Sequence, residues 1–286
     1  MAWNKLILGL LTLVSVGMII GSLFQLEFIH RLEEPLGVSH WENDKEAAAL
    51  RIGYVTASQG KGKGDKQNKE KGKDKVVVKP EVISWLPRMI LFHSFLSDEE
   101  CEFLKALSRP RLEISTVVDA KTGKGVKSQV RTSSGMFLSS EERKHPIVQA
   151  IENRIATFSQ IPVENGELIQ VLRYEVNQQY RPHHDYFSDS YNLKRGGQRV
   201  ATILMYLSDN VEGGETHFPL AGDGVCSCGG KKVSGVCIKP NKGDAVLFWS
   251  MDLNGESDRN SLHAGCPVLK GEKWSATKWM RQKATY

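Results

Sequence analysis

The feature that most constrains this chain is a run of 21 uncharged residues between Lys5 and Glu27, LILGLLTLVSVGMIIGSLFQL. At 1.5 Å per residue, about 20 apolar residues span the roughly 30 Å hydrocarbon core of a bilayer. A cleaved signal peptide has a shorter apolar region, of about 7–15 residues, followed by a small-residue cleavage site. Residues 25–29 (QLEFI) do not form such a site. The sequence therefore predicts an uncleaved transmembrane anchor over residues 6–26, after a short N-terminus of residues 1–5.

The charges beside this run predict its orientation. Lys5 and the α-amino group lie on the short side, whereas Arg31 on the other side is accompanied by three glutamates. Acidic residues count little in the positive-inside rule, so the short N-terminus is expected in the cytosol. This orientation predicts a single-pass type II protein, with its C-terminal part in the lumen of the endoplasmic reticulum, the Golgi or both.

Residues 27–79 have the composition of a flexible stalk. Within them, residues 60–75 (GKGKGDKQNKEKGKDK) hold seven lysines and three acidic residues, which accounts for most of the formal net charge of +5. Such a segment cannot bury enough apolar surface to fold. The other 270 residues carry a net charge of only +1. A nearly neutral folded part is not typical of a nucleic-acid-binding protein, so no nucleic-acid partner is expected.

Residues 80–286 have the pattern of one folded domain. Residues 83–92 look extended, Ser97 and Glu100 form a capping box before a helix over 101–108, and residues 145–158 have helical periodicity. Short β-branched and aromatic segments follow, separated by glycine-rich turns, at residues 167–176, 199–207, 244–249 and 273–280. Helices followed by many short strands predict an α+β protein, with a β-sandwich or jelly roll as its larger part.

A possible metal site begins with His183 and Asp185. In a strand, residues i and i+2 point to the same face, so this imidazole and this carboxylate can bind one ion. His263 is the best candidate for a third ligand from a distant part of the sequence. Two histidines and one carboxylate form the facial triad that holds non-haem Fe(II) with positions left open. An H-x-D pair alone is a weak signal, and neighbouring residues must support it.

Three further residues supply that support. Lys273 lies in a predicted strand whose alternation can turn its ammonium inward, and a buried lysine needs an anionic partner. A dicarboxylate cosubstrate would provide one. Thr216 and Tyr174 offer hydroxyls for the same pocket, although each also suits an ordinary strand position.

Residues 81–282 resemble the catalytic domain of the prolyl 4-hydroxylases, which are Fe(II)- and 2-oxoglutarate-dependent dioxygenases. The resemblance rests on residues 131–135 (RTSSG), Tyr174 through the segment 180–187 (YRPHHDYF), Gln198-Arg199, residues 213–216 (GGET), and His263 through Lys273-Trp274 to Lys278-Trp279. A short anchor before a single catalytic domain is similar to the plant enzymes. The resemblance implies a double-stranded β-helix (jelly-roll) core flanked by N-terminal helices.

The resemblance also implies a role for each site residue. His183, Asp185 and His263 would bind iron, and Lys273, Thr216 and Tyr174 would bind 2-oxoglutarate. The peptide groove would be lined by Tyr180, Arg199, Trp279, Arg131, Ser133 and Glu167. The implied reaction, of the procollagen-proline 4-dioxygenase type, hydroxylates C4 of peptidyl proline in proline-rich secretory-pathway proteins. It consumes O2 and 2-oxoglutarate, yields succinate and CO2, and uses L-ascorbate to keep the iron reduced. Proline-rich peptides or proteins are the expected partners, and homo-oligomers or hetero-oligomers with related hydroxylases stay open.

The other histidines and the cysteines have plainer interpretations. His184 points away from the ligand face, and His217 is interpreted as a polar strand-end residue. Cys226, Cys228 and Cys237 lack the usual C-x₂₋₄-C zinc spacing, so one disulfide among them is expected in an oxidising lumen. With Cys101 and Cys266 the count is five, so at least one cysteine is unpaired or pairs with another chain.

Two non-enzymatic functions compete with this prediction. The domain could be a catalytically inactive module that binds proline-rich peptides, or a partner subunit of another hydroxylase. The complete set of iron and 2-oxoglutarate residues argues against the first, and metal content with succinate formation would exclude the second. A lysyl hydroxylase is a further alternative among the dioxygenases, but no acidic recognition of a substrate lysine is suggested.

Overall fold

The computed structural model describes residues 77–119 and 122–285. Within these ranges, no helix is both long enough and apolar enough to span a bilayer. The predicted anchor (6–26) and residues 27–76 of the predicted stalk lie outside the described residues, and they stay predictions. The predicted end of the stalk at residue 79 is too late, because Val78 is already buried in the hydrophobic core and Lys79 begins the first described strand.

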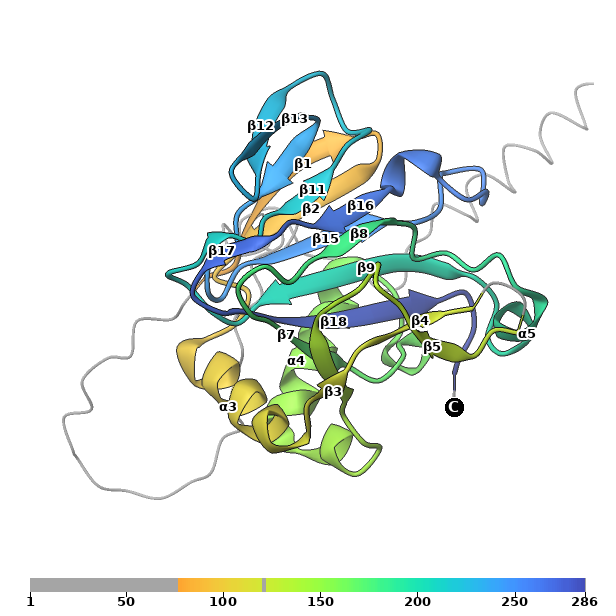
Figure 1. Ribbon diagram of the computed structural model, residues 1–286. Helices are drawn as coiled ribbons and strands as arrows, with labels where there is room; N and C mark the ends of the chain where they lie inside the picture. Colours follow the sequence, from red (N-terminus) through yellow and green to blue (C-terminus); the bar gives the residue numbers. More distant parts are fainter. Residues whose placement is uncertain (1–76, 120–121, 286) are drawn as a thin grey trace, which may run out of the picture. The chain divides into compact units, whose positions relative to one another are not determined.

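Eight antiparallel strands form the major sheet, in the order β1-β2-β15-β9-β18-β7-β6-β3 (Figure 1). Their bounds are β1 (Lys79–Trp85), β2 (Arg88–His93), β15 (Ala245–Trp249), β9 (Arg199–Tyr206), β18 (Lys273–Arg281), β7 (Gln170–Tyr174), β6 (Ser134–Phe137) and β3 (Glu113–Ile114). The minor sheet has the order β14 (Val236–Ile238), β11 (Thr216–Phe218), β16 (His263–Gly265) and β8 (Tyr180–His183). Three two-stranded pairs complete the strands: β4 (Thr116–Val118) with β5 (Gly125–Lys127), β12 (Val225–Cys228) with β13 (Lys231–Ser234), and β10 (Glu212–Gly213) with β17 (Val268–Lys270).

Two helices, α3 (Asp98–Ser108) and α4 (Pro146–Ser159), lie on the face of the major sheet that is turned away from the minor sheet (Figure 1). The predicted capping box begins α3, because Ser97 accepts a hydrogen bond from the Glu100 amide while the Glu100 carboxylate accepts one from the Ser97 amide. A proline at the first position begins α4. The other helical segments are short: α5 (Ser190–Lys194) and the 3-10 turns η1 (Arg109–Arg111), η2 (Glu142–Lys144), η3 (Val163–Asn165) and η4 (Arg259–Ser261).

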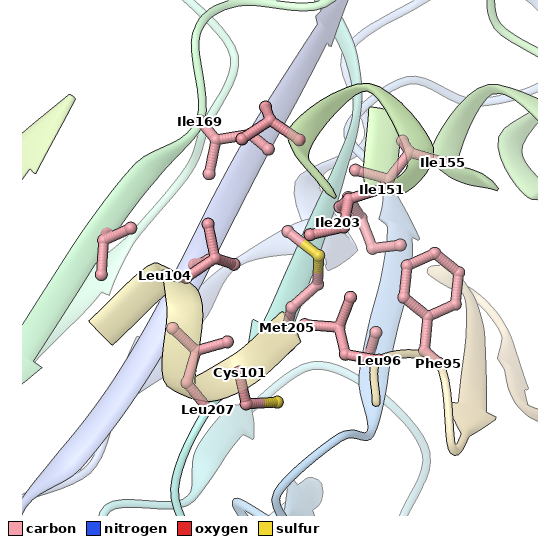
Figure 2. Packing of buried hydrophobic residues seen from close by; sticks show 14 of the residues in the cluster. Phe95, Leu96, Cys101, Leu104, Ile151, Ile155, Ile169, Ile203, Met205 and Leu207 are labelled. Carbon is pink, nitrogen blue, oxygen red and sulfur yellow. The ribbon is translucent and has the colours of Figure 1, made fainter. Parts of the chain in front are cut away.

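Side chains along the central strands alternate between two faces of the major sheet, one covered by the helices and the other facing the minor sheet. In β9, Ala201, Ile203 and Met205 are fully buried in the cluster beneath the helices. Figure 2 shows Ile203 and Met205 of β9 among Leu104, Ile151 and Ile155 from the helices. The intervening residues of β9 therefore point toward the minor sheet.

A second apolar cluster fills part of the space between the two sheets. It joins Tyr206, Val246 and Phe248 of the major sheet to Phe218 and Ile238 of the minor sheet. Two antiparallel sheets that face each other over an apolar layer agree with the predicted jelly-roll core.

Residues 83–92 differ from the single extended segment expected from the sequence. The chain turns at Leu86 and Pro87, and β1 folds back on β2 as a hairpin. The Ser84 side chain accepts a hydrogen bond from the Leu86 amide at 3.0 Å. Proline has no amide hydrogen to continue a strand ladder, which favours a turn at this position.

Candidate active site

Three of the predicted ligands meet at the neighbouring strands β8 and β16 of the minor sheet. His183 ends β8 and lies opposite His263, which begins β16. Asp185 lies two residues beyond the end of β8, in a bend rather than in the strand that the i, i+2 argument assumed. Its carboxylate nevertheless reaches both histidines, because His183 Nε2 lies 3.7 Å from Oδ1 and His263 Nε2 lies 3.6 Å from Oδ2.

The hydrogen bonds of the two histidines determine which nitrogens face the carboxylate as acceptors. His183 Nδ1 donates to the Arg181 carbonyl and His263 Nδ1 donates to the Ser261 carbonyl, both at 2.9 Å, since a carbonyl oxygen can only accept. Each Nε2 therefore presents a lone pair toward the Asp185 oxygens, which have lone pairs of their own. Such a group of acceptors without a shared proton fits a cation, and two neutral imidazoles with one carboxylate suit Fe(II).

The protonation states of these residues also suit a metal ion. Burial and the neighbouring His263 lower the pKa of His183 to about 3, which keeps that imidazole neutral. Burial alone would raise the pKa of Asp185, but the neighbouring His263, His183 and Arg199 and a hydrogen bond from Thr202 lower it to about 2. That bond, from Thr202 Oγ1 to Asp185 Oδ2, is 2.7 Å long and also fixes the carboxylate.

A narrow cavity of about 50 Å³ lies between the sheets beside these three residues. It is lined by all six residues predicted to bind iron or 2-oxoglutarate: His183, Asp185, His263, Lys273, Thr216 and Tyr174. Strand alternation explains the arrangement, because Lys273, Ser275, Thr277 and Trp279 of β18 face this cavity while the intervening residues face the helices.

Lys273 gives the cavity its anion-binding character. Its side chain is 3% exposed, and no carboxylate of the described residues lies within ion-pair distance of its Nζ. The nearest rings are those of Tyr174 at 5.5 Å and Tyr206 at 5.7 Å. Burial lowers the pKa of this ammonium to about 8, and the charge of Glu215 partly opposes the shift. The hydroxyl of Ser275, also in the cavity, is buried and has no hydrogen-bond partner. A carboxylate ligand fits both groups.

A wider groove of about 510 Å³ shares the triad residues His183 and Asp185 with the inner cavity, so these residues lie where the two spaces meet. Four of the predicted groove residues line it: Arg131, Tyr180, Arg199 and Trp279. The Arg199 guanidinium lies 4.1 Å from the centre of a Trp279 ring. The indole nitrogen of Trp279 is buried and has no hydrogen-bond partner among the described residues.

The structure does not bring Ser133 and Glu167 to the surface of this groove. Ser133 is completely buried, and its hydroxyl donates to Ser115 Oγ at 3.0 Å. Glu167 instead accepts two hydrogen bonds from Arg199, of 2.8 Å and 2.7 Å, and holds the guanidinium in place. Glu167 would therefore act on a ligand in the groove indirectly, by fixing the orientation of the Arg199 guanidinium.

Sequence reasoning missed two residues of the site, both on β9. Thr202 bonds to Asp185, and the Tyr206 hydroxyl forms a 2.8 Å hydrogen bond with Thr216 Oγ1 beside Lys273. Both lie on the inward face of a strand that the sequence identified. Leu204 lines the cavity, and in a strand every second residue points to the same face, so Thr202 and Tyr206 point inward as well.

The histidines and cysteines outside the triad agree with the plainer interpretations. His184 stacks on Tyr186, and its Nε2 bonds to the Arg259 carbonyl. The expected disulfide of the glycine-rich loop is Cys226–Cys237. A second disulfide, Cys228–Cys266, connects this loop to the end of β16, and the fifth cysteine, Cys101, is free and buried. His217 lies beside Cys226 and Cys237, but their disulfide removes the thiolates that a metal would require.

Comparisons with known proteins agree with this site. Residues 169–281, which contain all three triad residues and Lys273, match the 2OG-Fe(II) oxygenase superfamily. The chain is similar to "Prolyl 4-hydroxylase 1" of Arabidopsis thaliana, with 62% identity over 98% of each chain. It is also similar to "Probable prolyl 4-hydroxylase 8" of the same plant, with 55% identity over 70% of each chain. Among solved structures, a 2OG complex of the viral collagen prolyl hydroxylase vCPH from Paramecium Bursaria Chlorella virus-1 is similar, with a TM-score of 0.51 and 29% identity. That similarity covers 68% of this chain and 95% of the viral chain.

Proposed function

The chain belongs to the prolyl 4-hydroxylase family, and from this we propose that it hydroxylates C4 of prolines in proline-rich peptides and proteins. The reaction couples to the oxidative decarboxylation of 2-oxoglutarate to succinate and CO2. One observation carries the proposal. A buried and unpaired ammonium, Lys273, and a His-Asp-His cluster line the same cavity, and that cavity meets an open groove at the cluster.

The residues of the cavity fit both small ligands. His183, Asp185 and His263 would hold Fe(II), and Lys273 with Thr216 and Tyr174 would hold 2-oxoglutarate. When bound, iron and the oxo acid supply with O2 the oxidant that inserts oxygen into a C–H bond. The chain contributes a pocket whose apolar walls, including Leu204 and Phe248, limit access of water. Thr202 keeps the carboxylate in place.

The groove fits an extended proline-rich chain. Polyproline II has no internal hydrogen bonds, so its carbonyls are available, and such chains dock on aromatic-lined grooves. Trp279 and Tyr180 provide aromatic surface. Arg199 is held by Glu167 and is thus oriented before a peptide arrives. These contacts would position a proline ring at the junction with the inner cavity.

We further propose a location for the protein in the cell, a reductant for its iron and an assembly state. A type II anchor over residues 6–26 would place the domain in the lumen of the endoplasmic reticulum or Golgi, where two disulfides are stable. L-Ascorbate would keep the iron reduced. Assembly with itself or with related hydroxylases is compatible with the proposal.

Mass spectrometry of a proline-rich peptide after incubation with Fe(II), 2-oxoglutarate, ascorbate and O2 tests the activity. We expect prolines that have gained one oxygen atom, with one succinate formed for each hydroxylation. The Asp185→Ala variant should form neither product, because one of the three metal ligands is lost. Succinate without hydroxyproline on any proline-rich peptide, or full activity of the variant, would refute the proposal.

A further inference from the structure

Gln198 is a buried residue that lines neither the inner cavity nor the groove. It lies directly before β9, and its side-chain amide binds the main chain of Phe187, four residues beyond the end of β8. The Phe187 amide donates to Gln198 Oε1 at 2.5 Å, and Gln198 Nε2 donates to the Phe187 carbonyl at 2.9 Å. Only this orientation of the side chain satisfies both groups, because its oxygen accepts and its nitrogen donates. One side chain therefore replaces the pair of hydrogen bonds that a residue of a neighbouring strand would make.

This bridge to Phe187 holds the segment that carries the metal ligand Asp185. Residues 184–189 follow β8 and are not part of a strand, so the ladder of the minor sheet does not fix them. Side chains of β9 hold Asp185 instead. Thr202 donates to its carboxylate at 2.7 Å, and Arg199 Nη1 donates to its carbonyl at 3.4 Å. The segment is thus fixed to the start of β9 at two points, Asp185 and Phe187.

Gln198 can hold this segment because its own main chain is fixed. Its amide donates to Gln282 Oε1 at 2.8 Å, and its carbonyl accepts a 3.0 Å hydrogen bond from the Gln282 amide. Gln282 directly follows β18, the neighbour of β9 in the major sheet. The bridge therefore connects the segment after β8 to the central strands of the major sheet.

Phe187 also connects this segment to the peptide groove. Its ring contacts two guanidinium groups, with Arg199 at 4.5 Å and Arg281 at 4.6 Å from the ring centre. Arg199 in turn contacts Trp279, and Phe187, Arg199 and Trp279 all line the groove. A displaced Phe187 would therefore remove a cation–π contact from the arginine of the groove.

We propose that Gln198 is a positioning residue for both the metal site and the peptide groove. By binding both polar groups of the Phe187 main chain, it fixes Asp185 two residues earlier and places the Phe187 ring against Arg199. The inference rests on the proposed function, because it takes Asp185 as an iron ligand and Arg199 as a peptide contact. It adds that metal affinity and peptide affinity depend on one side chain that contacts neither ligand.

Gln198→Met tests the proposal, because methionine has a similar length and makes neither hydrogen bond. Calorimetric titration of Mn(II) into the metal-free protein measures metal affinity without turnover. Titration of an oligoproline peptide into the oxygen-free protein, saturated with Mn(II) and 2-oxoglutarate, measures peptide affinity. We expect Mn(II) affinity to fall about 10- to 100-fold, as on loss of other groups that orient metal ligands. Peptide affinity should fall roughly 2- to 30-fold, the range that corresponds to one cation–π contact.

Two further variants separate the two effects. Phe187→Leu keeps the main-chain bridge and removes the aromatic ring, so it should weaken peptide binding and leave Mn(II) affinity in place. Thr202→Val removes the hydrogen bond to the Asp185 carboxylate and leaves Phe187 bridged, so it should weaken Mn(II) binding and leave peptide affinity at saturating metal in place. Of the three variants, Gln198→Met alone should weaken both.

Val148→Ala is the control for a loss of stability alone. It opens a cavity in the core beneath the helices, on the face of the major sheet turned away from the site, and both affinities should stay at the wild-type values. If circular dichroism shows that Gln198→Met does not fold, Gln198→Glu replaces it. This variant keeps the bond from the Phe187 amide and loses only the donor to the Phe187 carbonyl. Its added negative charge would by itself strengthen the binding of a cation, so weaker Mn(II) binding would still report displacement of Asp185.

The outcomes distinguish this inference from the proposed function. If wild type binds no Mn(II), or binds no oligoproline when saturated with Mn(II) and 2-oxoglutarate, the proposed function is wrong. If wild type binds both and the Gln198 variant keeps either affinity, Gln198 does not position both the metal site and the groove. If Val148→Ala loses both affinities to the same extent as the Gln198 variant, the losses reflect stability, and the inference is equally wrong.

Discussion

Lys273 is the residue on which the chemistry of the inner cavity depends most. A charged group that is 3% exposed is stable only when a partner satisfies it, and the described residues provide no carboxylate within ion-pair distance. The cost of burying this ammonium is therefore best explained by a ligand with a negative charge. The carboxyl groups of 2-oxoglutarate match this requirement.

Replacing Lys273 by alanine should raise the KM for 2-oxoglutarate far more than the KM for peptide. A charge-assisted hydrogen bond in a desolvated pocket contributes about 1.5–3 kcal/mol, which corresponds to a roughly 10- to 150-fold loss of affinity. Steady-state kinetics with each substrate varied in turn measures the effect. Lys270→Ala, at an exposed lysine three residues earlier, is the control. An unchanged cosubstrate KM in Lys273→Ala would remove this residue from the pocket.

Individual residues were predictable from the sequence where strand alternation applied, and less so elsewhere. Lys273 came from inward strand alternation, and His263 was named as the best candidate for a ligand distant in sequence; the structure brings both to one cavity. Ser133 was expected in the groove but is completely buried against Ser115, since nothing in its local sequence reveals how β3 and β6 pack. The pairing of Cys228 with Cys266 was equally hidden, because it depends on the approach of two segments 38 residues apart.

The reverse face of β18 connects the active-site sheet to the helices. Lys278, between the inward Thr277 and Trp279, is 2% exposed and forms a short ion pair with Glu152 of α4. Glu152 also accepts a 2.6 Å hydrogen bond from Arg143 Nε, and Arg143 donates to the Val163 carbonyl. This buried cluster fixes α4 and the segment before Glu167 against the strand that carries Lys273 and Trp279.

Truncation of Glu152 should therefore destabilise the whole domain. The Glu152→Ala variant removes the carboxylate that pairs with the buried Lys278 and also bonds to the half-buried Arg143. Loss of the partner of a buried charge costs about 3–5 kcal/mol of unfolding free energy. Denaturant unfolding followed by circular dichroism measures it. Glu141→Ala breaks an exposed pair with Lys144, where the expected change is about 0–1 kcal/mol. Equal stabilities of the two variants would show that the buried cluster does not hold α4 to the sheet.

Helices and strands with a clear hydrophobic periodicity could be predicted from the sequence, whereas turns and connections without such a periodicity could not. The segments expected at 199–207, 244–249 and 273–280 correspond closely to β9, β15 and β18, and both long helices begin within three residues of their expected starts. Residues 83–92 contain Pro87 but are otherwise mostly apolar, so the segment was interpreted as one extended stretch and the turn that divides β1 from β2 was missed. The pairing order of the strands depends on contacts distant in sequence, which periodicity does not report.

Across the whole catalytic domain, the inner cavity and the outer groove meet at the His-Asp-His cluster. The inner cavity, of about 50 Å³, suits small ligands, whereas the groove, of about 510 Å³, continues past the cluster between the β4–β5 hairpin and the segment that follows β8. Only the groove is large enough for a chain of residues on both sides of the reacting one. This division predicts that affinity for the substrate is distributed along a peptide.

Longer proline-rich peptides should therefore bind more tightly than short ones, and free proline should be a poor substrate. Polyproline II loses little conformational entropy on binding, so each residue that reaches a groove contact adds affinity until the groove is full. Succinate release measured with free proline, a short unstructured proline-containing peptide and an oligoproline series gives KM against length. In Trp279→Ala the dependence on length should flatten, because the indole lines the groove as well as the inner cavity. The KM for 2-oxoglutarate should change far less than in Lys273→Ala, because Lys273 is intact. If free proline is the best substrate, or if KM does not change with peptide length, the groove does not bind an extended chain and the protein acts on a small molecule.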